Sequence, residues 1–262
     1  MSNAVHIVVP LLNEAGNVER LCGAFRELAA EEADGGRAVR FVLVDDGSTD
    51  GTADRVGEHG RGLDLIVLTH PTNRGPGAAF ATAFARLAGE LADGDWVVTM
   101  EGDNTSRHEL LQRMFRRAGE GFDLVLASPH VCGGRIAQAS PGRVLLSAMA
   151  NLFARSALGI HGLFSVTCFF RLQRGRLVRR LQEVYGPRII ERRGFEGMTE
   201  MLMKAIYLGA AISEVPLVLD SGMRAGPSKM RVGRTIAGYL GLSLDRRRWI
   251  REAEAQPEQP AP

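Results

Sequence analysis

The first hundred residues alternate between short apolar runs rich in β-branched residues and longer segments with helical spacing. The apolar runs fall at 5–12, 39–46, 63–70 and 96–100, and the helical segments between them fall at 14–33, 47–60 and 75–92. Near-continuous apolar runs are typical of strands that are buried on both faces. Strands joined by helices form parallel sheets that carry helices on both faces. The alternation therefore predicts an α/β chain with a mostly parallel central sheet.

Beyond residue 106 the pattern is less regular. It predicts helices at 108–118, 143–159 and 195–209, and strands at 122–128, 164–172 and 212–220. An amphipathic helix is expected at 231–253, and the composition of 254–262 predicts a disordered tail. No internal repeat or linker is evident, so we expect one domain, 1–230, followed by this C-terminal helical extension.

Composition narrows the class of protein. The chain has 262 residues, 45% of them hydrophobic and 24% charged, as in soluble globular proteins with a sizeable core. Its 32 basic and 30 acidic residues nearly balance, which argues against a nucleic-acid partner. Three cysteines without metal-type spacing, and no charged leader before an apolar segment, favour a reducing cytoplasmic setting. The most apolar long stretch, 144–170, contains Arg155 and is a poor candidate for a membrane span.

Polar, carboxylate-rich segments follow each of the four predicted strands. They read "PLLNE", "VDDGSTD", "HPTNRGPG" and "MEGDNTS". Parallel sheets bind ligands at the carboxyl ends of their strands, so these segments should share one rim. In the last segment, Glu101 and Asp103 are two residues apart and point the same way in an extended chain. The two negative charges repel each other unless something screens them. A bound cation, a pair of basic side chains or the solvent around an exposed loop could do so.

Two common nucleotide motifs are absent from the sequence. It has no GxxxxGK[ST] loop, and "GPGAAF" does not complete a GxGxxG and follows the third strand rather than the first. Use of ATP or a nicotinamide cofactor through these motifs is therefore unsupported.

The segments "VVPLLNE", "VLVDDGSTDGT", "NRGPGAA" and "MEGDN", in this order and spacing, resemble glycosyltransferase family 2. In the second half, "GRVLLSAMANLFARSALG" and "EVPLVLDSGMRAGPSKM" resemble elements of the dolichyl-phosphate and polyprenyl-phosphate mannose synthases. The resemblance covers about residues 5 to 240. It implies the GT-A fold, which is Rossmann-like, and transfer of a hexose from a nucleoside-diphosphate sugar.

In that family the acidic pair after the fourth strand ligates a divalent metal, here Mg²⁺ or Mn²⁺, that holds the diphosphate of the donor. Carboxylate oxygens suit such hard cations, which offset the charge of the departing nucleoside diphosphate. Asp103 is the expected catalytic residue and principal ligand. Glu101 replaces the family's first aspartate, and it binds the metal directly or through water. Thr105 falls where these synthases often have another polar ligand.

The resemblance also assigns a binding site for the nucleotide sugar. Its residues are Pro10, Asn13, Glu14, Asp45, Asp46, Arg74 and Gly75. Alternatives remain for several of them. Asp46 could instead accept hydrogen bonds from the turn that follows it. Glu14 could have no role beyond stabilising the first turn of its helix through the helix dipole, and Arg74 could face solvent. Leu12 stands where the family has an aromatic residue, so the base is left open between GDP- and UDP-linked sugars.

Residues of the second half are expected to bind the phosphate of a lipid-phosphate acceptor: Arg143, Ser147, Arg224, Ser228 and Lys229. A surface arginine and a buried serine are the alternative for Arg143 and Ser147. Met223 stands where the family has an arginine, with Arg224 one residue late. This departure, together with the lack of a predicted membrane span, leaves open a hydroxyl acceptor with Glu196 or Glu200 as the base. Glu101 in place of the family's aspartate leaves open a second alternative, an inactive relative that only binds sugar nucleotides.

The predicted C-terminal helix ends in "DRRRWIR" and carries Ile236, Tyr239, Leu240 and Leu244. This combination suits peripheral contact with the cytosolic face of an anionic membrane. An ordinary packed helix fits the same pattern.

Overall fold

The computed structural model describes residues 3–105, 108–223 and 232–255, without the side chains of Arg143, Leu146 and 232–237. Its main sheet has seven strands in the order β3-β2-β1-β4-β7-β5-β8. Only β7 runs antiparallel to its neighbours, so the mostly parallel sheet expected from the sequence is confirmed. The strands are β1 (Val5–Leu11), β2 (Val39–Asp45), β3 (Leu65–Thr69), β4 (Trp96–Thr99), β5 (Leu124–Ser128), β7 (Arg171–Arg174) and β8 (Ile212–Pro216).

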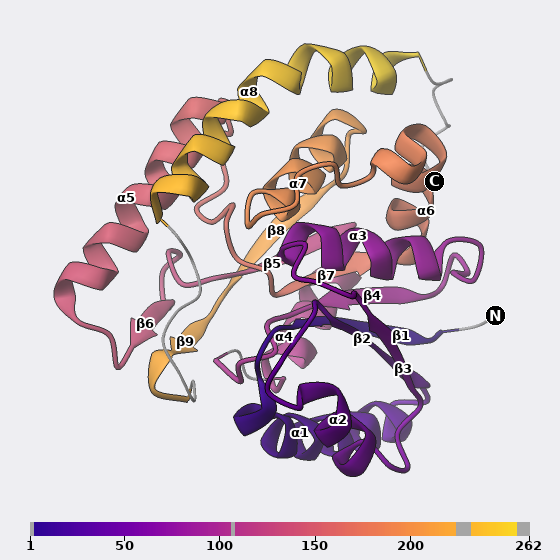
Figure 1. The fold of residues 1–262 in the computed structure, drawn as a ribbon. Coiled ribbons are helices and arrows are strands. Elements are labelled where there is room, and N and C mark those ends of the chain that lie inside the picture. Colours follow the sequence, from indigo (N-terminus) through magenta and orange to yellow (C-terminus); the bar gives the residue numbers. More distant parts are fainter. Residues whose placement is uncertain (1–2, 106–107, 224–231, 256–262) are drawn as a thin grey trace.

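Helices cover both faces of this sheet (Figure 1). One face carries α1 (Ala15–Asp34), α2 (Thr52–His59) and α4 (Leu110–Gly119). The other carries α3 (Pro76–Leu87), α6 (Gly175–Tyr185) and α7 (Gly197–Tyr207), with α5 (Pro141–Leu158) and α8 (Val232–Glu254) outside them. The short helices η1 (Gly186–Arg188) and η2 (Ser221–Met223) complete the described elements together with a small parallel sheet of β6 (Arg135–Ala137) and β9 (Val218–Asp220).

Alternate residues of the central strands feed two separate apolar layers. Val8 and Val97 face the α3 side, whereas Ile7 and Val98 face the α1 side, and all four side chains are at most 1% exposed. Both strand faces therefore exclude water, which explains why these segments are near-continuous apolar runs. The burial also fixes the register, because a one-residue slip would exchange the two layers.

The C-terminal helix is part of this packing. Tyr239, Leu242 and Trp249 of α8 are at most 2% exposed and belong to the same apolar cluster as α7. The Tyr185 hydroxyl donates to the Trp249 carbonyl over 3.2 Å, and α8 lies beside α5 and across α7 (Figure 1). The described part of the helical extension is thus docked on the main domain, while the boundary at residue 230 lies outside the described residues.

The strand predicted at 164–172 is wrong for most of its length, because only Arg171–Arg174 forms β7. The backbone N–H groups of this segment donate to side chains rather than to the carbonyls of a neighbouring strand. Phe164 N and Ser165 N donate to the Glu214 carboxylate over 2.6 and 2.8 Å, and Val166 N donates to Asn151 Oδ1 over 3.0 Å. The segment is therefore an ordered loop, which is fixed by residues distant in sequence.

Candidate active site

Loops from three adjacent strands interlock at the carboxyl edge of the sheet. Asn13 N donates to Ser48 Oγ over 2.8 Å, and Thr49 N donates to Asn13 Oδ1 over 2.8 Å. Asn13 has φ 50°, a left-handed conformation that asparagine tolerates better than most residues. Glu14 N donates to Thr52 Oγ1 over 2.8 Å. The loop after β1 is thus held directly on the loop after β2, and the half-buried Pro10 is the penultimate residue of β1 itself.

Asp45 and Asp46 are both buried at the end of β2 but have different partners. Asp45 Oδ1 accepts the N–H of Ser48 over 3.0 Å, so Asp45, rather than Asp46, binds the turn that follows. Asp46 Oδ1 accepts the N–H of Arg74 over 2.9 Å, and its Oδ2 accepts that of Gly75 over 2.7 Å. Asp46 therefore joins β2 to the turn after β3. Direct contact of either carboxylate with a nucleoside stays a prediction.

The acidic pair lies beside the end of β1. A Cβ on Gly102 would come within 2.4 Å of Leu11 Cδ2 and 3.0 Å of the Pro10 carbonyl oxygen, so only glycine lets the two loops approach this closely. Asp103 is 9% exposed, and its Oδ1 accepts hydrogen bonds from Thr105 N at 3.1 Å and Thr105 Oγ1 at 2.6 Å. Thr105 thus orients the carboxylate that the sequence singles out.

Glu101 is held from the opposite side of the loop. Its Oε1 accepts the N–H of Phe169 over 3.3 Å and lies 4.0 Å from Cys168 Sγ. Burial, and secondarily the Glu101 charge, raises the pKa of the Cys168 thiol, so the thiol stays protonated. Glu101 is only partly buried, and it is not sequestered in the core.

These two carboxylates fit a divalent metal that is shared with a ligand. Among the described residues, no group of three or more His, Cys, Asp or Glu side chains could enclose a metal ion. Mg²⁺ and Mn²⁺ accept one or two protein carboxylates when substrate phosphate oxygens and water complete the coordination. Glu101 and Asp103 supply that kind of donor set at a rim, so the residues present fit such an ion.

A glycine turn closes the next part of the rim. Gly75 has φ 95°, and a Cβ there would lie 2.3 Å from the Arg193 carbonyl oxygen; at Gly77 a Cβ would lie 2.0 Å from that of Arg192. The close backbone approach expected from these glycines is confirmed, and the segment approached is 192–194. The Arg74 side chain is exposed, so the choice between diphosphate and solvent as its partner stays open.

Glu196 and Glu200, the two carboxylates considered as bases, have unlike environments. Glu200 is fully buried and accepts hydrogen bonds from Glu191 N, Arg192 N and Lys204 Nζ, of which the last is 2.5 Å away. Burial raises its pKa against the effect of Lys204. These contacts make Glu200 a structural residue, whereas Glu196 is partly exposed.

Most of the predicted acceptor site lies outside the described residues. This holds for Arg224, Ser228 and Lys229 and for the side chain of Arg143, whereas Ser147 is half-buried on α5. The chain nevertheless reaches residue 223 beside the acidic loop. Asp220 N donates to the Thr105 carbonyl over 3.1 Å, and Arg20 donates to that of Met223. The predicted phosphate-binding segment thus begins next to Asp103.

Sequence reasoning missed the role of Arg171. The strand predicted at 164–172 includes Arg171 without assigning it a role, and the structure places it on β7 with 2% exposure. The guanidinium donates to the carbonyls of Cys168 and Val166 over 2.9 and 3.0 Å, and to that of Met198. Burial lowers its pKa to about 10, well above neutrality. Arg171 therefore organises the loop whose Phe169 N–H reaches Glu101, and an arginine-rich local pattern gave no signal of this.

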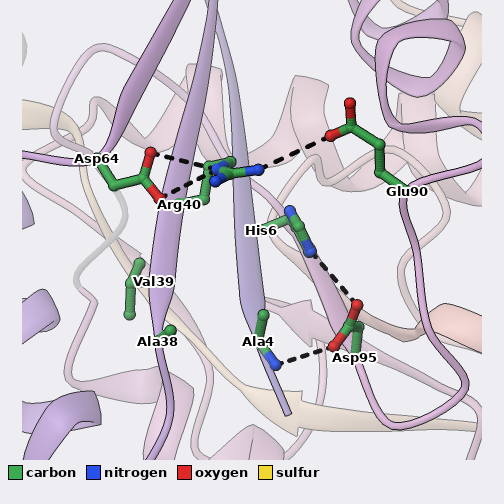
Figure 2. A pocket seen from close by; sticks show the side chains of 8 residues that line it. All are labelled: Ala4, His6, Ala38, Val39, Arg40, Asp64, Glu90 and Asp95. Carbon is green, nitrogen blue, oxygen red and sulfur yellow. Dashed lines mark hydrogen bonds and ion pairs between the residues drawn. The ribbon is translucent and has the colours of Figure 1, made fainter. Parts of the chain in front are cut away.

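A second hollow lies at the opposite, amino-terminal edge of the strands (Figure 2). Its volume is about 220 Å³, and its charged and polar lining comprises His6, Arg40, Asp64, Glu90 and Asp95. Arg40 is bound by Asp64 at 3.0 Å, and His6 Nε2 lies 3.6 Å from Asp95 Oδ2. None of these residues belongs to the loops of the candidate site.

Sequence comparison assigns the chain to a family. The sequence model of Glycosyl transferase family 2 matches residues 6–181, well over half of the chain. The protein therefore belongs to glycosyltransferase family 2 and is a glycosyltransferase.

Two relatives and one solved structure show the extent of the similarity. The polyprenol monophosphomannose synthase of Mycolicibacterium smegmatis is 27% identical, over 86% of this chain and 80% of its own. The undecaprenyl-phosphate mannosyltransferase of Micrococcus luteus is 28% identical, over 91% of each chain. The mannosyltransferase PcManGT of Pyrobaculum calidifontis, solved with GDP-Man and Mn²⁺, has a TM-score of 0.51 and 17% identity, over 97% of this chain and 74% of its own. That last likeness shows a shared fold.

Proposed function

We propose that this glycosyltransferase moves a hexose from a GDP- or UDP-linked sugar to a polyprenyl or dolichyl phosphate. The observation that carries the proposal is the rim where the loops after β1, β2 and β4 meet, with Asp103 beside the end of β1. The names of both relatives describe enzymes that join mannose to a polyprenyl phosphate, and the two matches cover 86% and 91% of this chain.

The donor is expected to lie across this rim. Glu101 and Asp103 would hold Mg²⁺ or Mn²⁺, which supplies charge stabilisation for the departing nucleoside diphosphate. The mannosyltransferase PcManGT was solved with GDP-Man and Mn²⁺, which supports a nucleotide sugar and a divalent metal as the bound molecules. The ends of β1 and β2 and the residues that follow β1, with Pro10, Asn13, Glu14 and Asp45, would bind the nucleoside, while Arg74 and the Gly75 backbone approach the diphosphate.

A phosphate acceptor simplifies the chemistry required of the protein. The second pKa of a phosphate monoester is about 6, so its oxygen is already anionic at neutral pH. That oxygen can attack the anomeric carbon in line as the bond to the nucleoside diphosphate breaks, which inverts the anomeric configuration. A hydroxyl acceptor would need a positioned base, and the partly exposed Glu196 is the remaining candidate of the two glutamates considered.

A lipid acceptor also requires access to a bilayer, and an exposed apolar surface supports it. On α5, Leu145, Met149 and Leu152 are 62%, 59% and 59% exposed, and their spacing places them on one helix face. Leu240 and Leu244 on the neighbouring α8 are 50% and 84% exposed. We call these five residues the α5–α8 apolar surface. Contiguous apolar patches of this kind are typical of protein or membrane contacts.

The proposed contact is peripheral. No helix in the described part of the chain is long and apolar enough to cross a bilayer. Asp220, the residue before η2, donates its N–H to the Thr105 carbonyl of the acidic loop over 3.1 Å. We expect the acceptor phosphate to approach Asp103 from this side while its lipid tail stays in the bilayer. Contact with the cytosolic face is the corresponding proposal for localisation.

Donor binding tests the proposed function directly. Calorimetric titration with GDP-mannose, UDP-glucose and dTDP-glucose should identify one preferred base in the presence of Mn²⁺. Removal of the metal with a chelator should weaken binding by about tenfold or more, because the diphosphate loses its cation. Failure of every nucleotide sugar to bind in the presence of Mn²⁺ would refute the proposed function.

A further inference from the structure

His70 occupies a buried position between the rim and α3. It follows β3 directly, is 4% exposed, and donates its backbone N–H to the Asp45 carbonyl over 2.8 Å. Its Nδ1 lies 2.6 Å from Asp46 Oδ1, and its Nε2 lies 2.9 Å from Thr82 Oγ1. Both ring nitrogens are therefore used by side chains from two different elements.

A neutral imidazole satisfies all of these groups at once. With the proton on Nδ1, the ring donates to the Asp46 carboxylate, and Nε2 accepts the hydroxyl proton of Thr82. The ring orientation is then fixed by α3 at one nitrogen, and the carboxylate is fixed by the ring at the other. A carboxylate–histidine pair of this kind defines the orientation of both partners.

Asp46 transmits this orientation to the turn after β3. The same Oδ1 that meets His70 accepts the N–H of Arg74, and Oδ2 accepts the N–H of Gly75 over 2.7 Å. Gly75 and Gly77 in turn lie against the backbone of 192–194 without room for a Cβ. A rotation of the Asp46 carboxylate would break both of these backbone hydrogen bonds. The turn would then lose the contacts that fix its position against the backbone of 192–194.

We propose that His70 is a positioning residue for the sugar nucleotide. It fixes Asp46 from α3, and Asp46 fixes the Arg74–Gly75 backbone at the place where the diphosphate is expected. This inference rests on the proposed function, because it assumes that the turn borders the donor. His70 itself does not contact the reacting atoms. Its effect is on donor affinity, through the shape of the turn.

Two substitutions separate the two hydrogen bonds of the ring. In His70→Asn, the amide nitrogen can take the place of Nδ1 and keep the bond to Asp46 while losing Thr82. In His70→Gln, the longer side chain can take the place of Nε2 and keep Thr82 while losing Asp46. Charge-assisted hydrogen bonds are the stronger kind, so the Asp46 bond should dominate.

Titration with the preferred nucleotide sugar and Mn²⁺ should show a clear order among the variants. We expect His70→Gln to weaken binding by about tenfold or more, and His70→Asn and Thr82→Val by about threefold or less. Hydrogen exchange should show faster exchange at the Arg74 and Gly75 amides in His70→Gln alone. A purely structural role would lower the melting temperature of His70→Gln but leave its dissociation constant and those two amides unchanged, which would overturn the inference.

The unsubstituted protein separates this inference from the proposed function. If it binds no sugar nucleotide, the proposed function fails. If it binds and all three variants bind equally well at a temperature where they are folded, the proposed function stands and the role of His70 is refuted. Equal losses in His70→Asn and His70→Gln would also contradict the inference, because transmission would then not pass through Asp46.

Discussion

At the scale of single residues, the two carboxylates of the acidic loop are held by different partners. Asp103 accepts hydrogen bonds from the backbone N–H and the hydroxyl of Thr105, whereas Glu101 accepts the N–H of Phe169 over 3.3 Å. A fixed carboxylate suits a principal metal ligand, since little side-chain entropy is lost when the ion binds. The longer Glu101 side chain is suited to direct or water-mediated coordination.

Asp103→Asn should therefore remove metal-dependent turnover while the fold persists. The amide is nearly isosteric and can still accept from Thr105, but it lacks the negative charge that attracts the cation. We expect kcat/KM to fall by about a hundredfold or more in saturating Mn²⁺, with a change in melting temperature of only a few degrees. Glu101→Gln should lose less activity. Near-normal turnover of Asp103→Asn would exclude Asp103 as the principal ligand.

Single residues also mark a limit of sequence inference. The sequence pointed to both Asp45 and Asp46, but the partners of each depend on the turn at 48 and the turn at 74–75, which are brought together only by the fold. His70 lacked any motif of its own. Its position between Asp46 and Thr82 follows from the packing of β2, β3 and α3 rather than from local spacing.

At the scale of elements, periodicity predicted the first-half strands and helices because burial on two sides leaves a strong local pattern. The segment 164–170 lacks this determinant, since its conformation depends on Glu214, Asn151 and the Arg171 guanidinium. β-branched and aromatic residues favour strands, but the distant Asn151 and Glu214, together with the adjacent Arg171, override that preference here. Contacts of this kind are not encoded in any short window of sequence.

Arg171→Met should destabilise the protein strongly. It removes the buried donor shared by the carbonyls of Val166, Cys168 and Met198 and leaves those acceptors without it. We expect a loss of about 2–4 kcal/mol in the free energy of unfolding, measured by denaturant titration. Arg179→Met is the matched control, because its exposed ion pair with Asp93 should contribute less than about 1 kcal/mol. Equal stabilities of the two variants would contradict this role.

The α5–α8 apolar surface should bind membranes mainly through α5. Simultaneous replacement of Leu145, Met149 and Leu152 with Gln should weaken sedimentation with phosphatidylglycerol vesicles by about tenfold or more, because three exposed apolar side chains no longer enter the interface. Val67→Gln, a 40% exposed residue on β3, is the control. Unchanged sedimentation of the triple variant would argue against this surface as the membrane contact.

Not all of the arginines near the end of α8 are available to bind lipid headgroups, although their sequence had suggested it. Arg248 is engaged by Glu191 at 2.7 Å and by Asp245 at 3.3 Å, whereas Arg246 and Arg247 are exposed. Replacing Arg246 and Arg247 with Gln should thus reduce binding to anionic vesicles at low salt, with little effect at high salt. We expect the apolar substitutions to weaken binding at both salt concentrations.

At the scale of the whole molecule, the candidate site and a buried histidine that makes the free energy of unfolding depend on pH lie at opposite edges of one sheet. The carboxyl edge carries the candidate site, whereas His6 is buried at the amino edge, 4% exposed, with its Nε2 3.6 Å from the Asp95 carboxylate (Figure 2). Burial lowers the pKa of His6, although the nearby Asp95 opposes the effect. The folded protein therefore keeps His6 neutral to a lower pH than the unfolded chain does.

This difference predicts the direction of acid destabilisation. As pH falls below about 6.5, the unfolded chain takes up a proton at His6 before the folded protein does, so the free energy of unfolding decreases. One such group contributes at most about 1.4 kcal/mol per pH unit. Denaturant titrations between pH 7.5 and 5.5 should show a shallower decline for His6→Gln than for the parent. His161→Gln, at an exposed position, should not change the slope; an unchanged slope in His6→Gln would contradict the prediction.

Burial also lowers the pKa of His130, so some of the decline should remain in His6→Gln. The double variant His6→Gln/His130→Gln should flatten the curve further. The carboxylates whose pKa values are lowered by hydrogen bonds, such as Glu191 with Arg248, lose their contribution only at more acidic pH.

The central claim is that the chain transfers sugar to a lipid phosphate. It is tested most directly by incubating the protein with its preferred nucleotide sugar, Mn²⁺ and equal amounts of a polyprenyl phosphate and the corresponding polyprenol, followed by mass spectrometry of the lipid products. The account predicts the polyprenyl phosphate-linked sugar as the main product, with its formation reduced about tenfold to a hundredfold in Arg143→Gln or Lys229→Gln while nucleotide binding changes little. Exclusive glycosylation of the polyprenol hydroxyl, abolished by Glu196→Gln and unaffected by Arg143→Gln or Lys229→Gln, would contradict it.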